Sequence, residues 1–214
     1  MAQRPKQAEP RPAPRLYLAT PPVSDPAAIA DALDAALGAA DIAAVLLRLA
    51  DGDERSQINI VKALAPVVQK HDTALLLDGH ASLVARGGAD GAHLRGIAAF
   101  SAALDTLKPE RIAGAGGLPT RHDAMTAAEA GADYVMFGDG NSRDLAAVEE
   151  RVAWWSELFE IPCVAFAATT GEIAPLVAAG ADFIALDCVW QDARGMVPAL
   201  AEIAPLLRLP EAVL

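Results

Sequence analysis

The sequence predicts a single (β/α)8 TIM barrel of the α/β class, and three observations support this prediction. A Gly-Ala-Asp turn followed by an apolar run occurs at 88–95, 131–138 and 180–187, with a looser copy at 38–48. Each copy follows an Ala-rich segment and leads into an unbroken apolar strand, as expected for strands buried on both faces. Further apolar runs raise the number of strands to eight, nearly all separated by helix-like segments. An open doubly wound sheet is the alternative, but the complete set of eight units favours the barrel.

Prolines and capping residues mark the elements in the first half of the chain. Pro21 and Pro22 end the first strand, and Ser24 or Asp25 is expected to cap a helix with Pro26 at its first position. The expected elements are, in order, strand 16–20, helix 26–37, the strand ending at Arg48, a helix from the acidic stretch 51–56 to about Lys70, strand 74–78, a short helix to Arg86, the strand of the 88–95 motif and helix 97–107.

Glycine turns and a capping threonine mark the second half. The strand over 111–115 breaks into the glycine-rich turn 114–117, and Thr120 is expected to cap the helix that follows. The remaining elements are a helix to Ala130, the strand of the 131–138 motif, helix 144–159, strand 162–167, a helix starting at Gly171, the strand of the 180–187 motif and helix 195–207.

Composition and charge exclude several classes of protein. The formal net charge of −11 argues against nucleic acid as a main partner, although a local pocket could still hold a small phosphorylated ligand. No apolar run is long enough to span a membrane, so no membrane partner is expected. Cys163 and Cys188 fall in or beside strands and indicate a reducing, cytoplasmic location rather than a disulfide framework. The Pro-rich, basic residues 1–15 read as a disordered tail, which leaves 16–214 as the barrel domain.

Ligands of such barrels bind at the carboxyl ends of the strands, so the polar residues there are the candidates for chemistry. These residues are Arg48, Asp78, His80, His93, Arg95, Asp139, Asn141, Thr169, Thr170, Asp187 and Gln191. The aspartates of the Gly-Ala-Asp turns lie at the opposite rim and are expected to be structural.

A phosphate group is the first ligand to consider. Thr169 and Thr170 offer hydroxyls and amides that either bind phosphate or simply cap a helix, and the turn with Gly116 and Gly117 could also cradle an anion. Arg48 either binds phosphate or forms a salt bridge with a neighbouring carboxylate, Asp78.

Three further side chains have simpler interpretations. Asp78 could hold Mg²⁺, an ion that usually takes one or two carboxylates together with phosphate oxygens. His93 is expected to be a core histidine that bonds a backbone carbonyl, and Cys188 is expected to serve packing because no activating base is close to it in sequence.

Six segments of the chain resemble the thiamine-phosphate synthases and their thiazole-tautomerase relatives: 16–20, 46–48, 74–78, 88–94, 131–135 and 180–182. The resemblance implies the barrel fold and a transferase of thiamine biosynthesis. Such an enzyme joins hydroxymethylpyrimidine pyrophosphate to thiazole phosphate and releases pyrophosphate, with magnesium. It implies that Arg48 binds pyrophosphate, that Asp78 takes the metal, and that Thr169, Thr170 and Cys188 line the phosphate end. A homodimer is also implied, in which Trp154 and Trp155 either form a contact or pack within their own protomer.

Six positions of the family's site carry other residues in this chain, so the active-site motifs are degenerate. They correspond to 46–50, where only the arginine of Gln-x-Arg-x-Lys remains, and to 78–79, 95–99, 117–119, 138–143 and 167–168. The second acidic metal ligand is absent because Arg95 and Gly96 follow His93-Leu94. These changes favour, as an alternative function, a non-catalytic or repurposed barrel that binds a phosphorylated metabolite or a partner. A third hypothesis is a different barrel chemistry that uses Asp78, His80, Asp139 and Asp187.

Overall fold

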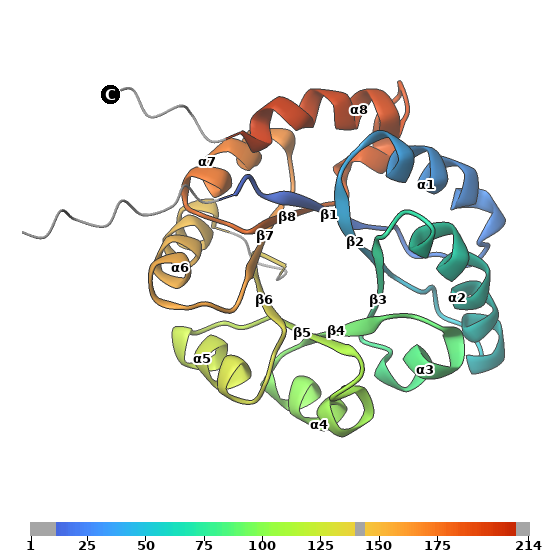
Figure 1. The fold of residues 1–214 in the computed structure, drawn as a ribbon, viewed down its shortest axis with the longest axis horizontal. Coiled ribbons are helices and arrows are strands. Elements are labelled where there is room, and N and C mark those ends of the chain that lie inside the picture. The colour runs from blue at the N-terminus through green and yellow to red at the C-terminus, as the bar shows by residue number, and fades with distance from the viewer. Residues whose placement is uncertain (1–11, 140–143, 209–214) are drawn as a thin grey trace, which may run out of the picture.

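The protein is a closed barrel of eight parallel strands enclosed by helices (Figure 1). The structure is a computed structural model, and it describes residues 12–139 and 144–208. The strands are β1 Arg15–Ala19, β2 Ile42–Leu47, β3 Ala74–Asp78, β4 Gly91–Arg95, β5 Ile112–Gly116, β6 Tyr134–Phe137, β7 Cys163–Ala167 and β8 Phe183–Leu186. Each strand pairs with its neighbours in chain order, and β8 pairs with β1 to close the barrel. The barrel prediction is confirmed, and the open sheet is excluded.

Each strand is followed by a helix on the outside of the barrel. The α-helices are α1 Ala27–Ala39, α2 Glu54–Gln69, α3 Val84–Gly87, α4 Ile97–Leu107, α5 Arg121–Glu129, α6 Leu145–Leu158, α7 Ile173–Ala178 and α8 Met196–Ile203. Short 3-10 turns are η1 Ala81–Leu83, η2 Thr170–Glu172, η3 Cys188–Gln191 and η4 Ala204–Leu207. Among the described residues, no helix is long and apolar enough to cross a membrane.

Most element boundaries agree with the sequence to within a few residues. Strand β3 and helix α4 have the predicted bounds, and Thr120 caps α5 through a reciprocal capping box with Asp123. The predicted start of α1 agrees as well. Pro26 has helical dihedral angles, with φ −64° and ψ −29°, and the Asp25 carboxylate before it accepts the backbone amide of Ala27 at 2.9 Å, as a capping aspartate does. Of the expected tail, residues 1–11 lie outside the described residues, and Arg15 already belongs to β1.

The Gly-Ala-Asp turns are structural, as expected. The carboxylates of Asp90, Asp133 and Asp182 accept backbone amides near the start of the preceding strand, at 2.7, 2.7 and 2.8 Å. The backbone amide of each aspartate donates in turn to the carbonyl of the same strand residue. Each turn thus joins two neighbouring strands at the amino-terminal rim, far from the strand ends that carry the candidate site.

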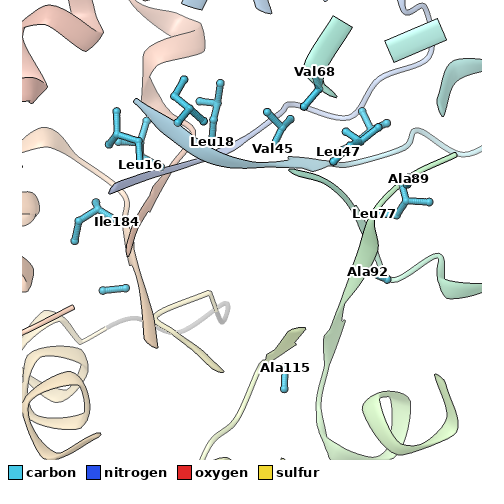
Figure 2. Packing of buried hydrophobic residues seen from close by; sticks show 14 of the residues in the cluster. Leu16, Leu18, Val45, Leu47, Val68, Leu77, Ala89, Ala92, Ala115 and Ile184 are labelled. Carbon is cyan, nitrogen blue, oxygen red and sulfur yellow. The ribbon is translucent and has the colours of Figure 1, made fainter. Parts of the chain in front are cut away.

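The apolar residues form two layers separated by the strands. Residues that point outward, such as Leu16, Leu18, Val45 and Leu47, pack against the helices (Figure 2). Alternate residues fill the barrel interior: Tyr17, Ala19, Ala44, Leu46, Leu76, Tyr134, Met136, Val164 and Ala185. This interior is rich in small side chains, and its two tyrosines are the polar members of the cluster.

The two adjacent tryptophans of α6 have packing roles. Trp155 is fully buried, donates from its indole N–H to the carbonyl of Ile161 at 2.7 Å and stacks on Phe159 with ring centroids 4.0 Å apart. The guanidinium carbon of Arg121 lies over the indole of Trp154, 4.8 Å from the ring centroid. Packing within the protomer therefore accounts for Trp155, and the homodimer stays a prediction.

Candidate functional site

Five charged side chains gather at the carboxyl ends of the strands. Arg48 follows β2, Asp78 and Arg95 end β3 and β4, Asp139 follows β6, and Asp187 follows β8. The parallel pairing of the strands brings all of these positions to one mouth of the barrel. This is the mouth at which barrel proteins bind their ligands.

Arg48 lies between two carboxylates. Its Nη1 is 2.8 Å from Oδ2 of Asp187, and its Nε is 3.7 Å from Oδ2 of Asp78. Nη1 also donates to the carbonyl of Thr20 at 3.4 Å, and the guanidinium carbon lies 5.9 Å from the ring centroid of Phe166. The salt bridge with Asp78 is therefore present, and the closer pairing with Asp187 was not foreseen. The Nε atom is buried and has no hydrogen-bond acceptor.

Arg95 holds Asp78 from the other side. Its Nε and Nη2 donate to the two oxygens of Asp78 at 3.3 and 3.2 Å, and its Nη1 donates to the backbone carbonyl of Asp139 at 2.8 Å. Asp78 is thus shared by two guanidinium groups. Its side chain is 18 % exposed, whereas that of Arg95 is 39 % exposed, so Arg95 is the solvent-facing member of the pair.

His93 is a buried core histidine, but its predicted backbone partner is wrong. Its Nδ1 lies 3.0 Å from the hydroxyl of Tyr134, and its Nε2 lies 3.3 Å from Oδ2 of Asp139. The Tyr134 hydroxyl is also 2.8 Å from the hydroxyl of Tyr17. A continuous polar chain therefore runs from the barrel interior to the rim. Burial raises the pKa of both tyrosines well above their ordinary value, so both hydroxyls are protonated at neutral pH.

Asp139 fills the glycine turn that was predicted to cradle an anion. Both of its oxygens lie 3.0 Å from the backbone amide of Gly117. A Cβ atom on Gly116 would lie 2.4 Å from Asp139 and from His93, so only glycine fits there. Burial works to raise the pKa of Asp139, but the hydrogen bond with His93, the Gly117 amide and the charge of Arg95 together lower it below the ordinary value.

Thr169, Thr170 and Cys188 line a separate cavity of about 260 Å³ between the loops that follow β7 and β8. Thr169 precedes η2 but makes no side-chain cap there. The backbone amide of Ala168 at this cavity donates to the carboxylate of Glu172 at 2.9 Å. Burial, followed by the charge of Asp187, raises the pKa of the Cys188 thiol. A thiol held protonated is a poor nucleophile, which agrees with the packing role predicted for Cys188.

The remaining predicted residues are not all drawn into this cluster. The third hypothesis named four residues, and the two arginines contact three of them. Arg48 pairs with Asp187, and Arg95 pairs with Asp78 and donates to the backbone carbonyl of Asp139. His80 lies beyond the end of β3, immediately before η1, and Asn141 falls outside the described residues. A different cavity of about 330 Å³, lined mostly by apolar residues, opens at the amino-terminal mouth of the barrel, away from the charged strand ends.

The side chains around Asp78 fit a magnesium ion poorly. Among residues 12–139 and 144–208, no group of three or more His, Cys, Asp or Glu side chains could hold a metal. One carboxylate can suffice when a substrate supplies phosphate oxygens, but both oxygens of Asp78 already face the N–H groups of Arg95. A divalent cation there would also lie close to two positive guanidinium groups, which repel it.

The fold and this cluster define a (β/α)8-barrel protein with an arginine-containing charged site at the carboxyl ends of its strands. The model of the thiamine monophosphate synthase family matches residues 16–187, which is most of the chain. The chain belongs to this family.

Similar proteins agree with that assignment. A thiamine-phosphate synthase of Rhodospirillum centenum is 41% identical over 203 residues, covering 91% of this chain and 98% of the relative. Another, of Hyphomonas neptunium, is 37% identical and covers 90% and 93% of the two chains. The solved structure of thiamine phosphate pyrophosphorylase from Pyrococcus furiosus superposes with a TM-score of 0.74 at 22% identity, covering 92% of this chain and 96% of that one. That structural likeness supports the fold.

Proposed function

We propose that this protein is a thiamine-phosphate synthase that joins hydroxymethylpyrimidine pyrophosphate to thiazole phosphate. The observation that carries the proposal is the 41% identity to a relative of that name over nearly the whole of both chains. The reaction breaks the bond between the pyrimidine methylene carbon and the pyrophosphate oxygen. A new bond forms from that carbon to the thiazole nitrogen, and pyrophosphate leaves with its negative charge.

Arg48 is the residue in best position to hold the pyrophosphate. Its planar guanidinium suits the oxygens of a phosphate group, and the buried Nε without an acceptor is a donor that a ligand oxygen could use. Positive charge at this point stabilises the charge that develops on the leaving group. The ligand would replace Asp187 or Asp78 as the partner of Arg48.

The cavity with Thr169, Thr170 and Cys188 would take the phosphate end of the thiazole substrate. Its two hydroxyls are hydrogen-bond donors for phosphate oxygens. Gly116 and Gly117 are further predicted contacts, although the amide of Gly117 must first exchange the Asp139 carboxylate for the ligand. A homodimer and a cytoplasmic location also belong to this proposal as predictions from the family. Magnesium on Asp78 is the family's expectation too, but the Arg95 guanidinium on both Asp78 oxygens disfavours it.

The test is a synthase assay on the purified full chain with both phosphorylated precursors. Formation of thiamine phosphate with release of one pyrophosphate per product is the expected result. Omitting either precursor in turn is the control, since each omission must abolish the product. A folded protein that forms no thiamine phosphate with or without Mg²⁺ would contradict the proposal.

A second candidate function is a barrel that binds a phosphorylated metabolite or a partner without catalysis. One observation weighs against catalysis: two backbone amides suited to the anionic groups of the substrates, those of Gly117 and Ala168, already donate to the chain's own carboxylates Asp139 and Glu172. This function predicts that a phosphorylated thiamine precursor raises the melting temperature without being turned over. An unchanged melting temperature with both precursors would contradict it.

A further inference from the structure

Arg48, Asp78 and Arg95 alternate in charge along three consecutive strand ends. In the pairing of β2 with β3, Leu47 is opposite Leu77, so Arg48 and Asp78 occupy the next step of the same register. In the pairing of β3 with β4, Asp78 is opposite His93, two residues before Arg95. The register therefore places one carboxylate between two guanidinium groups, and the contacts of Asp78 with both are present.

The two arginines keep donors that their protein partners do not use. Arg95 donates three hydrogen bonds from a group with five N–H donors, and its side chain is 39 % exposed at the mouth. The buried Nε of Arg48 makes no hydrogen bond, because its nearest carboxylate oxygen, Oδ2 of Asp78, is 3.7 Å away, and an unmade hydrogen bond at a buried donor is costly. Both features point to a ligand with several anionic oxygens.

The same geometry leaves little reason for a metal ion. The guanidinium of Arg95 meets both Asp78 oxygens side by side, in the manner of a bidentate ion pair. It thereby occupies the carboxylate that a divalent cation would need, and it brings positive charge to the same place.

We propose that Arg95 takes the role of the divalent cation at this site, so that Arg48 and Arg95 together bind a phosphate or pyrophosphate group without a metal ion. Asp78 is then a positioning residue that orients the two guanidinium groups. The inference rests on the proposed function for the identity of the natural substrate, but its chemistry needs only an anion with several oxygens.

The test measures the binding of inorganic pyrophosphate to the full chain by calorimetry, once in EDTA and once in Mg²⁺. We expect binding in EDTA that is within about threefold of the binding in Mg²⁺. Arg95→Ala should weaken the binding in EDTA by about ten- to a hundredfold, the usual effect of losing hydrogen bonds to a charged group. Arg95→Lys should recover only part of it, because lysine lacks the planar fork. Arg86→Ala, which removes an exposed arginine that pairs with Glu54 on the outer surface, is the matched control and should bind normally.

Asp78→Asn separates positioning from metal binding. If Asp78 only orients the arginines, this variant still binds pyrophosphate in EDTA and shows no new dependence on Mg²⁺. Binding that needs Mg²⁺ in the parent protein and is lost in Asp78→Asn would overturn the inference. Normal binding by Arg95→Ala, or no binding of pyrophosphate under either condition, would also overturn it.

The synthase assay and the binding test can fail separately. Metal-free binding through Arg95 without thiamine phosphate formation would retain this inference and reject the proposed function. Magnesium-dependent turnover that Arg95→Ala leaves intact would retain the proposed function and reject this inference.

Discussion

His93 and Tyr134 stand in one row of the barrel interior with Gly114 between them. In the strand pairing, His93 is opposite Gly114, and Gly114 is opposite Tyr134. A Cβ atom on Gly114 would lie 2.0 Å from the tyrosine ring, so the missing side chain leaves the space through which the hydroxyl reaches His93 at 3.0 Å. A glycine within a strand, which weakens the strand by itself, here permits a buried hydrogen bond across two strand spacings.

Tyr134→Phe should destabilise the fold more than Tyr17→Phe. The Tyr134 hydroxyl contacts both Tyr17 and His93, so its removal leaves two buried polar groups without this partner. Removal of the Tyr17 hydroxyl leaves Tyr134 still bonded to His93. We expect a loss of about 2–3 kcal/mol for Tyr134→Phe and about 1 kcal/mol for Tyr17→Phe in urea unfolding at neutral pH.

The double variant is the control for that comparison. Because the two hydroxyls share one hydrogen bond, the losses should not add, and Tyr17→Phe should cost little in the background of Tyr134→Phe. Equal and additive losses would show that the hydroxyl chain is not a connected network.

Asp139 should make the stability of the protein sensitive to acid. Its pKa in the folded state lies below the ordinary value, which is about 3.9 in an unfolded chain. A depressed carboxyl pKa contributes stability that is fully present above the unfolded pKa and is lost as the pH falls through the folded pKa. Urea unfolding from pH 6 down to pH 3 should therefore show a smaller acid-induced loss in Asp139→Asn than in the parent protein.

Asp139→Asn should also be less stable than the parent at pH 7, by about 1–3 kcal/mol, because the charged partner of His93 and Gly117 is lost. Asp105→Asn, at an exposed position of α4, is the control and should retain the parent's acid-induced loss. An acid profile of Asp139→Asn that superposes on the parent's would exclude Asp139 as a source of the pH dependence.

The sequence predicted the features that depend on neighbouring residues better than the contacts between residues far apart in the chain. The Gly-Ala-Asp turns and the apolar runs are local patterns, and they predicted the eight strands and the structural role of Asp90, Asp133 and Asp182. The partners of His93 lie 41 and 46 residues away, and only the closure of the barrel brings them close. The positions of the two tyrosines within their strands could have placed them in the barrel interior, but no sequence pattern shows that Gly114 leaves room between the rings.

The charged site was only partly predictable for the same reason. Arg48 and Asp78 end neighbouring strands, so their salt bridge followed from the predicted order of strands. The contact of Arg48 with Asp187 links residues 139 positions apart. The contacts of Arg95 depend on side-chain directions that strand ends alone do not fix.

The geometry that the Gly-Ala-Asp turns share predicts that replacing Asp182 destabilises the fold more than replacing Asp41. Asp182→Ala should remove the acceptor of the Cys163 amide at the start of β7 and cost about 1–3 kcal/mol. Asp41 occupies the same place in the looser copy, but its carboxylate pairs with the exposed Arg15 and accepts no strand amide among the described contacts. Asp41→Ala should therefore cost less than about 1 kcal/mol, as is usual for a surface ion pair.

Urea unfolding of Asp182→Ala and Asp41→Ala checks this contrast, because the two aspartates occupy the same place in their copies of the repeat. Equal losses would mean that the strand amide at Asp182 contributes no more than a surface pair, and the structural role assigned to the turns would be wrong.

Arg48→Ala should lower kcat/KM of the synthase reaction by at least about a hundredfold, because it removes the positive charge proposed to stabilise the leaving pyrophosphate. Stability is a separate readout: the variant leaves Asp78 with Arg95 as a partner but deprives Asp187 of its contact at 2.8 Å.

Asp187→Asn tests the same site in the opposite direction, since it weakens the internal partner with which pyrophosphate competes for Arg48. We expect Asp187→Asn to lower the KM for the pyrophosphate substrate while Arg48→Ala raises it. If both variants raised KM to the same extent, the carboxylate would be a substrate contact in its own right, and the competition between Asp187 and the ligand would have to be abandoned.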